Sequence, residues 1–516
     1  MPTTDPTSFL QYQYSTKAPN MGTLLTLCAA ISSLLLLRVI GIGIYKVYFH
    51  PLSKYPGPKF AAASRIPTAW HMVRGNNIRW VASLHKKYGD VVRTGPDELS
   101  YINAQGWKDI YGHRIRGKAL FPKNPRFFPK PPNGVDSLVA ANAEPHTRAR
   151  RIFSHAFSDK ALREQEPLFQ KYVDLLLQKL KEMVQGDPQH EHVFDMVNMY
   201  NFTTFDVMAD LTFGESLQLL ENSDYSPWVA TIFQNIKATT MMRATYYFPT
   251  IEMLLSLLIP KSLADKRISH FKHSTDRVDK RLSANSEHQR PDIWGIILRQ
   301  EESKGLSLDE MHSNAAGFMI AGTETTATLL SGLTFHLLKN QESLAKLVHE
   351  IRSTFSSYDD ITLERLVRLE YLNACLEEGL RMYPPVPIGT TRVVPPEGAP
   401  ICGEFVPGGT IVSMSHYSTY RSAKNFAFPD SFIPERWLDD PRFEADNKLA
   451  FQPFSYGPRN CLGKNMAYHE MRLILSKVLW SFDLTLTGNQ NWSDQDVFTL
   501  WNKGPLMVKL SPARES

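Results

Sequence analysis

A stretch of ten residues near the C-terminus, Phe454–Gly463, constrains the fold more than any other part of the chain. After it, apolar side chains recur at helical spacing, so we expect a loop that enters a helix. Cys461 then lies beside a helix N-terminus, where peptide dipoles and free N–H groups favour a thiolate. Gly457 allows a tight or left-handed turn, and Gly463 allows the backbone to approach a flat, bulky group. The alternative is a small cysteine buried in the core.

The same stretch matches every fixed position of the pattern F-x-x-G-x-R-x-C-x-G and therefore resembles the haem-binding signature of the cytochrome P-450 monooxygenases. The resemblance implies haem b as the cofactor, with Cys461 as the axial ligand of its iron. Phe454 would shield the sulfur from water, and Arg459 would meet an acidic edge of the haem. The implied architecture is the cytochrome P-450 fold, mainly α with small β-sheets.

The composition, 43% hydrophobic and 21% charged, is typical of a globular protein with a large core. The net charge of +5 gives no support to a nucleic-acid function. It suits a surface that faces an anionic membrane or an acidic protein partner. The four cysteines are too few and too scattered for a disulfide framework or a zinc site.

The N-terminal part of the chain predicts a membrane anchor. Residues 1–20 are polar, and residues 21–45 are apolar and long enough to cross a bilayer. Basic residues are more frequent after this stretch than before it, which places the rest of the chain in the cytosol. We expect a short lumenal tail, an uncleaved single-pass anchor in the endoplasmic reticulum membrane, a proline-rich hinge over residues 46–66 and a haem-binding catalytic domain over residues 67–516.

Two other features bear on the membrane and on modification. The apolar run Ile251–Ile259 could belong to the core or could dip into the membrane beside the anchor, and the sequence favours neither. The glycosylation sequons at Asn201 and Asn491 are coincidental if the catalytic domain is cytosolic.

The first half of the catalytic domain shows local signals. A helix is expected over Ile78–Tyr88, followed by short strands at residues 91–93 and 99–102 and by a basic, proline-rich loop over residues 111–145. A second helix begins at His146 and carries Arg150 four residues later, a pair that could be a solvated basic face. In the resembled family this pair points at the haem propionates, and Arg392 resembles a further propionate contact.

A long helix is expected from a capping box at Ser307 to about Lys339. The glycine and three threonines of residues 321–326 are poor helix formers, so a locally loosened turn is expected there. The segment resembles the oxygen-binding turn A-G-x-E-T of cytochromes P-450. By that resemblance, Glu324 delivers protons. Thr325 supplies the alcohol that hydrogen-bonds the oxygen.

An acid and a base three residues apart, Glu378 and Arg381, form a pattern that is weak by itself. Its context resembles the scaffold set of the family, in which these two residues and Arg436 form a buried charged group that fixes the haem loop. Such a group is tolerable in a core only when its charges are paired with one another.

The resemblance implies a monooxygenase that inserts one oxygen atom from O2 into a lipophilic small molecule, by hydroxylation, epoxidation or successive oxidation. The chain looks like a microsomal cytochrome P-450 of the fungal secondary-metabolism type, and such a protein would take a terpenoid or polyketide substrate. Electrons would come from NADPH through a cytochrome P-450 reductase docked near Lys464, with a cytochrome b-type protein as a further candidate donor. The candidate pocket lining is Phe318, Gly322, Ile388 and Phe498.

The alternative is a haem-thiolate isomerase or dehydratase that needs neither O2 nor a reductase. Such members tend to lose the acid and the alcohol of the long helix, and this chain retains Glu324 and Thr325. A haem sensor or carrier is disfavoured for the same reason.

Overall fold

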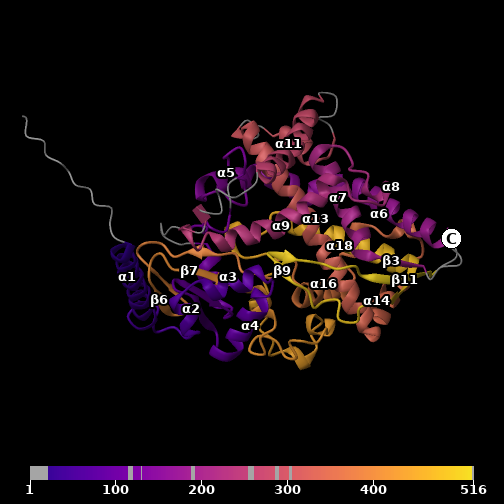
Figure 1. The fold of residues 1–516 in the computed structure, drawn as a ribbon. Coiled ribbons are helices and arrows are strands. Elements are labelled where there is room, and N and C mark those ends of the chain that lie inside the picture. Colours follow the sequence, from indigo (N-terminus) through magenta and orange to yellow (C-terminus); the bar gives the residue numbers. More distant parts are fainter. Residues whose placement is uncertain are drawn as a thin grey trace, which may run out of the picture.

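The structure is a computed structural model that describes residues 21–113, 120–128, 131–186, 192–250, 252–253, 261–284, 290–300 and 305–513. As predicted, it is mainly α-helical with small β-sheets (Figure 1). Its helices are α1 (Met21–Tyr48), α2 (Lys59–Ala63), α3 (Ile66–Val73), α4 (Asn77–Tyr88), α5 (Ala143–Phe153), α6 (Asp159–Gln185), α7 (Met196–Phe213), α8 (Leu219–Asn222), α9 (Pro227–Thr245), α11 (Lys261–Ser283), α12 (Ile293–Leu298), α13 (Leu308–Lys339), α14 (Gln341–Thr354), α15 (Leu363–Leu366), α16 (Glu370–Met382), α17 (His416–Tyr420) and α18 (Lys464–Ser481).

The strands form small sheets at the edges of this helical body. A four-stranded sheet has the order β1-β2-β7-β4, with β2 and β7 parallel, and a three-stranded antiparallel sheet has the order β3-β11-β8. Two hairpins, β5-β6 and β9-β10, complete the set. The strands are β1 (Val91–Gly95), β2 (Glu98–Tyr101), β3 (Val193–Asp195), β4 (Arg392–Val393), β5 (Ala399–Ile401), β6 (Glu404–Val406), β7 (Ile411–Met414), β8 (Phe482–Leu486), β9 (Val497–Phe498), β10 (Leu500–Trp501) and β11 (Met507–Pro512).

Helix α13 runs through the centre of the body and begins and ends where the sequence predicts (Figure 1). The capping box is complete: the Ser307 hydroxyl accepts from the Glu310 N–H, and the Glu310 carboxylate accepts from the Ser307 N–H. The prediction of a loosened turn at residues 321–326 is wrong, because α13 is regular there. The hydroxyls of Thr323, Thr325 and Thr326 each donate to the carbonyl four residues earlier, so these side chains find acceptors within the helix.

Small residues on α13 let neighbouring segments approach it closely. A Cβ on Gly322 would lie 2.6 Å from the sulfur of Met208 on α7, and one on Gly332 would lie 2.3 Å from the ring of Tyr383. Helix α7 is buried along almost its whole length, and α16 and α18 also pack on α13. The core therefore forms around α13, which fixes the position of the residues along it.

The predicted local elements of the N-terminal half are confirmed. Helix α4 covers the predicted range and ends at Tyr88, before Gly89, whose φ is +102°. Strands β1 and β2 pair antiparallel around the predicted turn.

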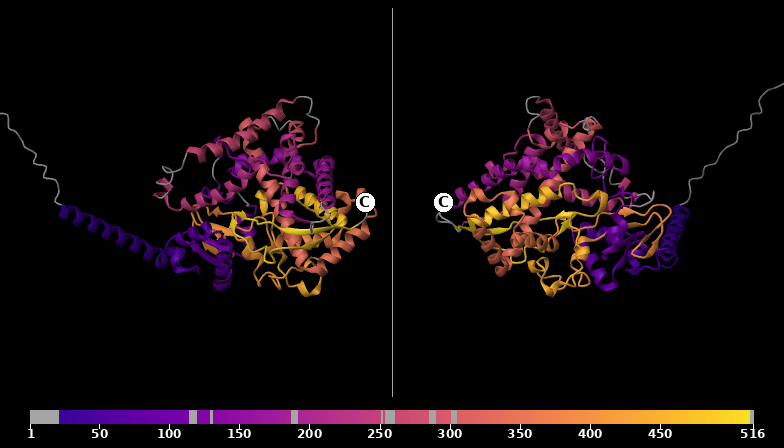
Figure 2. Two further views of the ribbon diagram at one scale, coloured as in Figure 1. Left: turned by 45° about the vertical axis from the view of Figure 1, so that its right-hand side comes forward. Right: turned by 180° about the vertical axis from the view of Figure 1, so that it is seen from behind.

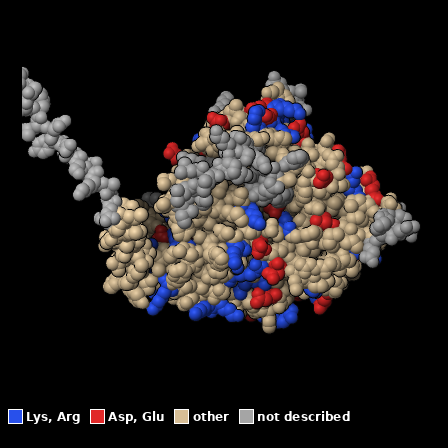
Figure 3. Space-filling model, viewed as in Figure 1, with Lys and Arg blue, Asp and Glu red and all other residues tan. Residues whose placement is uncertain are grey.

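Helix α1 is long and apolar enough to cross a membrane, with a mean hydropathy of 2.2 over Leu24–Tyr48 and none of that span buried. It projects from the body (Figure 2), and its surface carries few charges (Figure 3). It continues three residues beyond the predicted end of the anchor at residue 45.

The predicted hinge, residues 46–66, contains α2 and packs on β1. The carbonyl of Pro56 accepts from the Arg93 N–H at 2.8 Å, and the Arg93 side chain donates to the Lys46 carbonyl. A Cβ on Gly57 would lie 2.4 Å from the Arg93 carbonyl oxygen, so only glycine permits this approach. The division of the chain into tail, anchor, hinge and catalytic domain stays a prediction.

The apolar run and the two glycosylation sequons differ in how far the structure describes them. The run Ile251–Ile259 lies outside the described residues except for Glu252 and Met253. Asn201 is buried on α7, and its amide donates to the Tyr225 hydroxyl at 2.7 Å, so its sequon is inaccessible in the folded protein. Asn491 is exposed.

Candidate functional site

The loop before α18 has the shape that its sequence predicts. Gly457 has φ +75°, and a Cβ there would lie 2.1 Å from the Tyr111 carbonyl oxygen. The Cys461 N–H donates to the Phe454 carbonyl at 2.8 Å, which closes the loop. Helix α18 begins at Lys464, three residues after the cysteine, with Gly463 as its N-cap. The thiol is therefore held beside a helix N-terminus, as expected.

The electrostatic balance at the thiol differs from the expectation. Burial raises the pKa of Cys461, and this effect outweighs the hydrogen bond from the Gly463 backbone and the nearby charges of Arg150 and Lys464, which lower it. Cys461 nevertheless keeps accessible surface. The protein alone therefore holds a neutral thiol, and a bound metal cation would stabilise the thiolate.

The middle of α13 also keeps accessible surface where a core helix would be covered. Ala321 is exposed, Ile320 retains 36% of its surface, and Thr325 is partly exposed. The Thr325 hydroxyl donates to the Ala321 carbonyl at 2.7 Å. A bulky group between α13 and the Cys461 loop would cover this surface. Ala321 and Ile320 were not singled out from the sequence, although Ala321 is the first residue of the motif.

Five basic side chains from four separate segments of the sequence gather in one region: Lys123, His146, Arg150, Arg392 and Arg459. Burial and the neighbouring positive charges lower the pKa of Lys123 to about 6 and that of His146 to about 3. Burial and Arg392 lower the pKa of Arg459 to about 10. We call these five residues the cationic cluster. Mutual repulsion of this kind indicates a site for an anion.

Within the described residues, two atoms of the cationic cluster are buried without a hydrogen-bond partner: Nη1 of Arg392 and Nε of Arg459. Unpaired buried donors of this kind are costly unless a ligand accepts from them. The carboxylates of a haem are acceptors of the required charge. The residues present therefore fit a haem, with Cys461 toward its iron and the cationic cluster toward its propionates.

The side chains that the resemblance assigned to the propionates also have partners within the protein. Helix α5 begins at Ala143, three residues earlier than predicted, so His146 lies in its first turns and is buried. Arg150 donates to the carbonyl and the side chain of Asn460 and so braces the cysteine loop. Arg459 donates to the Ala141 carbonyl at 2.7 Å.

The proposed proton donor has a partner that sequence reasoning missed. Oε1 of Glu324 accepts from Nζ of Lys503 at 2.7 Å and from the Thr328 hydroxyl at 3.3 Å, and both members of the ion pair are 3% exposed. Oε2 of Glu324 is buried and has no partner in the described part of the chain. Lys503 lies in the C-terminal segment, and nothing in its local sequence signals this contact.

The scaffold set assembles as the resemblance implied. Glu378 accepts from Arg381 at 2.8 Å and from Arg436 at 3.1 Å, and all three side chains are at most 1% exposed. Asp446 adds a second carboxylate on Arg436, so the two positive and two negative charges balance. Trp437 donates to Glu378 at 3.1 Å, which ties the segment before the cysteine loop to α16.

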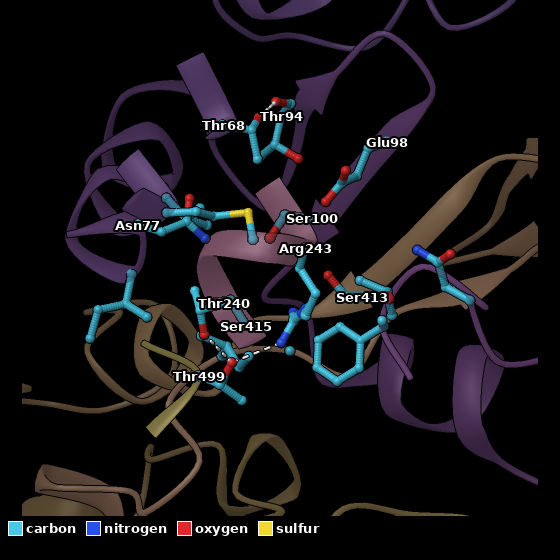
Figure 4. A pocket seen from close by; sticks show the side chains of 18 of the residues that line it. Thr68, Asn77, Thr94, Glu98, Ser100, Thr240, Arg243, Ser413, Ser415 and Thr499 are labelled. Atoms are coloured by element: carbon cyan, nitrogen blue, oxygen red, sulfur yellow. Dashed lines mark hydrogen bonds between the residues drawn. The ribbon is translucent and has the colours of Figure 1, made fainter. Parts of the chain in front are cut away.

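The four predicted pocket residues do not line a single cavity. Phe318 packs edge-on against Phe153, with ring centroids 5.1 Å apart, and Gly322 contacts Met208. Ile388 lines one cavity, shown in Figure 4, and Phe498 lines another of about 350 Å³ that also contains Glu324 and Lys503. We call them the Arg243 cavity and the Lys503 cavity after a charged residue in each wall.

Comparison with known proteins identifies the family of this chain. The chain matches the cytochrome P450 family over residues 62–510. It is 52% identical over 492 residues to the cytochrome P450 monooxygenase efuB of Hormonema carpetanum, covering 95% of this chain and 97% of that protein. The cytochrome P450 monooxygenase lcsI of Purpureocillium lilacinum is 46% identical over 492 residues, with 94% of each chain covered. Averantin hydroxylase of Dothistroma septosporum is 42% identical over 495 residues, with 95% and 92% covered. The chain therefore belongs to the cytochrome P450 family and is an oxidoreductase of the monooxygenase type.

Proposed function

We propose that this protein is a haem-thiolate monooxygenase that oxidises a lipophilic secondary metabolite at the endoplasmic reticulum membrane. The proposal rests on one observation: the protein has both a cysteine, Cys461, at a helix N-terminus and the cationic cluster that includes Arg392 and Arg459. The fungal relatives named cytochrome P450 monooxygenase support the same activity. A terpenoid or a polyketide is the substrate class that we favour.

Bound haem b would supply the oxygen chemistry, with one atom of O2 going into the substrate and the other into water. Cys461 would ligate the iron, and the cationic cluster would hold the propionates. Thr325 would offer its hydroxyl on the oxygen side, at the exposed middle of α13. Glu324 would deliver protons from the Lys503 cavity, where its carboxylate faces the buried ammonium.

Electrons would come from NADPH through a cytochrome P-450 reductase, with a cytochrome b-type protein as a further candidate donor. Lys464, at the start of α18, is exposed and lies over the rings of Phe454 and Tyr468. A cation at this position would meet an acidic partner on the cysteine side of the protein. Helix α1 would anchor the protein in the membrane, with the catalytic domain in the cytosol.

Spectroscopy of the purified protein tests the ligand. The reduced, CO-treated protein should show the Soret shift of a thiolate-bound haem, and Cys461→Ser should abolish that shift while haem is retained. Cys375→Ser is the matched control, because Cys375 is a buried free cysteine on α16. A thiolate-type spectrum in Cys461→Ser would overturn the proposal.

Coupling measurements test the oxygen side. Replacing Thr325 by alanine should divert reducing equivalents to peroxide, so NADPH consumption should exceed product formation more than in the natural protein. Thr334→Ala, farther along α13, is the control and should keep the natural coupling. Consumption of NADPH that depends on both substrate and reductase would also exclude an isomerase or a dehydratase.

A further inference from the structure

The Arg243 cavity combines a charged side chain with many hydroxyl groups, in a protein whose proposed substrate is lipophilic. It lies between β1, β2, α3, α9 and the segment before β4 (Figure 4). Its volume of about 90 Å³ has room for several waters or one small polar group, and not for a whole lipophilic molecule. Eight of the 21 residues that line it are serine or threonine: Thr68, Thr94, Ser100, Thr240, Thr391, Ser413, Ser415 and Thr499.

Arg243 is the charged side chain at the centre of this wall. It extends from α9 into the cavity, toward Thr499 (Figure 4). Its guanidinium donates to the Thr499 hydroxyl at 2.7 Å and lies 3.9 Å from the ring centroid of Phe127. No carboxylate of the described residues forms a salt bridge with it. Burial lowers the pKa of Arg243 despite the attraction of Tyr247 and Glu98, so its charge is incompletely compensated.

The one acidic side chain in the wall, Glu98, already has a cationic partner. Glu98 forms a salt bridge with Arg65, which also pairs with Asp97, and the Arg65 side chain is 8% exposed. Arg126 also lines the cavity and is exposed. The cavity is therefore positive overall, and a guanidinium with four further N–H donors beside many hydroxyls is suited to an oxygen anion.

Part of the wall of the cavity is apolar and includes Ile388, Met72 and Val497. Ile388 and Gly389 line it, and Arg392 of the cationic cluster follows three residues after Gly389. A molecule whose charged end is held at Arg243 can therefore extend its apolar part along this segment. A wall with a charged part and an apolar part fits a ligand with one polar end and one lipophilic end.

We propose that Arg243 binds the carboxylate of an acidic lipophilic substrate, so that the enzyme selects substrates with a free carboxyl group. One guanidinium without an acidic partner matches one carboxylate, and Thr240 and Thr499 supply hydroxyls beside it. This inference rests on the proposed monooxygenase function and narrows its substrate class. Arg243 acts here as a specificity residue, and the reacting carbon lies elsewhere in the molecule.

Equilibrium dialysis with the full-length holoprotein tests the inference without turnover. The probes are lauric acid, its methyl ester and the matching alcohol, which share the apolar chain and differ in charge. The natural protein should bind the acid about tenfold or more tightly than the ester, which is the contribution of one charge-assisted hydrogen bond. Arg243→Gln should lose this preference, and Arg243→Lys should keep part of it.

The control is Lys237→Gln, which removes the same charge from the same helix but lines the Lys503 cavity. It should bind the three probes as the natural protein does. Equal binding of acid, ester and alcohol by the natural protein would overturn the inference. So would an Arg243→Gln variant that loses all three probes equally, which indicates a structural role.

The CO spectrum of each variant separates this inference from the proposed function. A thiolate-type spectrum without any preference for the acid refutes the inference alone. Absence of that spectrum in the natural protein refutes the proposed function, whatever the probes show.

Discussion

The ammonium of Lys503 lies 2.7 Å from a carboxylate oxygen of Glu324, and both side chains are 3% exposed. The two residues are separated by 179 positions and join the C-terminal segment to the middle of α13. Burial lowers the pKa of Lys503, and the charge of Glu324 opposes that effect. The acid assigned to proton delivery is therefore one half of a buried ion pair, and the pair should govern both stability and proton supply.

Replacing Lys503 by methionine should destabilise the protein by about 3–5 kcal/mol, because it leaves a carboxylate buried without its partner. Urea unfolding at neutral pH measures this change in the free energy of unfolding. The double variant Lys503→Met with Glu324→Met removes both charges and should recover much of the lost stability. Lys237→Met, an exposed lysine in the wall of the same cavity, should change the stability little. A double variant as unstable as the single one would contradict this explanation.

The cysteine loop gives a prediction about backbone conformation. Gly457→Ala combines a left-handed φ of +75° with a Cβ only 2.1 Å from the Tyr111 carbonyl oxygen. Gly488→Ala is the matched control, with φ +86° and ordinary contacts of 3.7 Å and more to Met507. The control should cost about 1–2 kcal/mol of unfolding free energy, from the backbone conformation alone. Gly457→Ala should lower the unfolding free energy by more than the control does, and it should also lower the haem content of the purified protein. Equal effects in the two variants would contradict this prediction, because they would show that the structure relieves the clash.

How far the sequence predicts this molecule depends on whether a signal is local. The capping box at Ser307 places the start of α13 correctly, because its hydrogen bonds join residues three positions apart. The loop at Gly457 is also predicted correctly from the residues around it. The threonines of α13 misled the prediction, because helix propensity counts their cost and omits the packing of α7, α16 and α18 on α13, which keeps the helix regular.

Contacts between distant segments were predictable only through the family resemblance. Glu378, Arg381 and Arg436 meet as the resemblance implied, whereas Asp446 completes the set without any sequence signal. Lys123 joins the cationic cluster from a loop whose basic composition was visible but whose position was not. Such contacts depend on tertiary packing, which a local pattern does not encode.

The scaffold set predicts a second large effect on stability. Glu378→Gln removes the carboxylate that accepts from Arg381 and Arg436, both of which are buried. The variant should lose about 3–5 kcal/mol of unfolding free energy, since it leaves a buried cation incompletely paired. Glu364→Gln removes an exposed ion pair with Arg368 and should be nearly neutral. Thermal unfolding of the two variants gives the comparison; similar losses would refute a special role for the buried set.

The cationic cluster predicts that haem binding takes up a proton. The pKa of about 6 leaves Lys123 largely neutral at neutral pH in the protein alone. Anionic propionates beside it should raise that pKa toward its ordinary value, so Lys123 gains a proton as haem binds. Because protons are taken up on binding, haem affinity should fall as the pH rises above about 6. Calorimetry of haem binding to the apoprotein, in buffers of different ionisation enthalpy, counts the protons.

Lys123→Met should reduce this proton uptake by close to one proton for each haem and flatten the pH dependence of haem affinity. Lys108→Met is the control, because Lys108 is exposed and should leave both quantities unchanged. His146, whose pKa of about 3 is also lowered by burial and by the same positive neighbours, would account for any uptake that persists in Lys123→Met. An uptake as large in Lys123→Met as in the natural protein would show that the propionates lie away from Lys123.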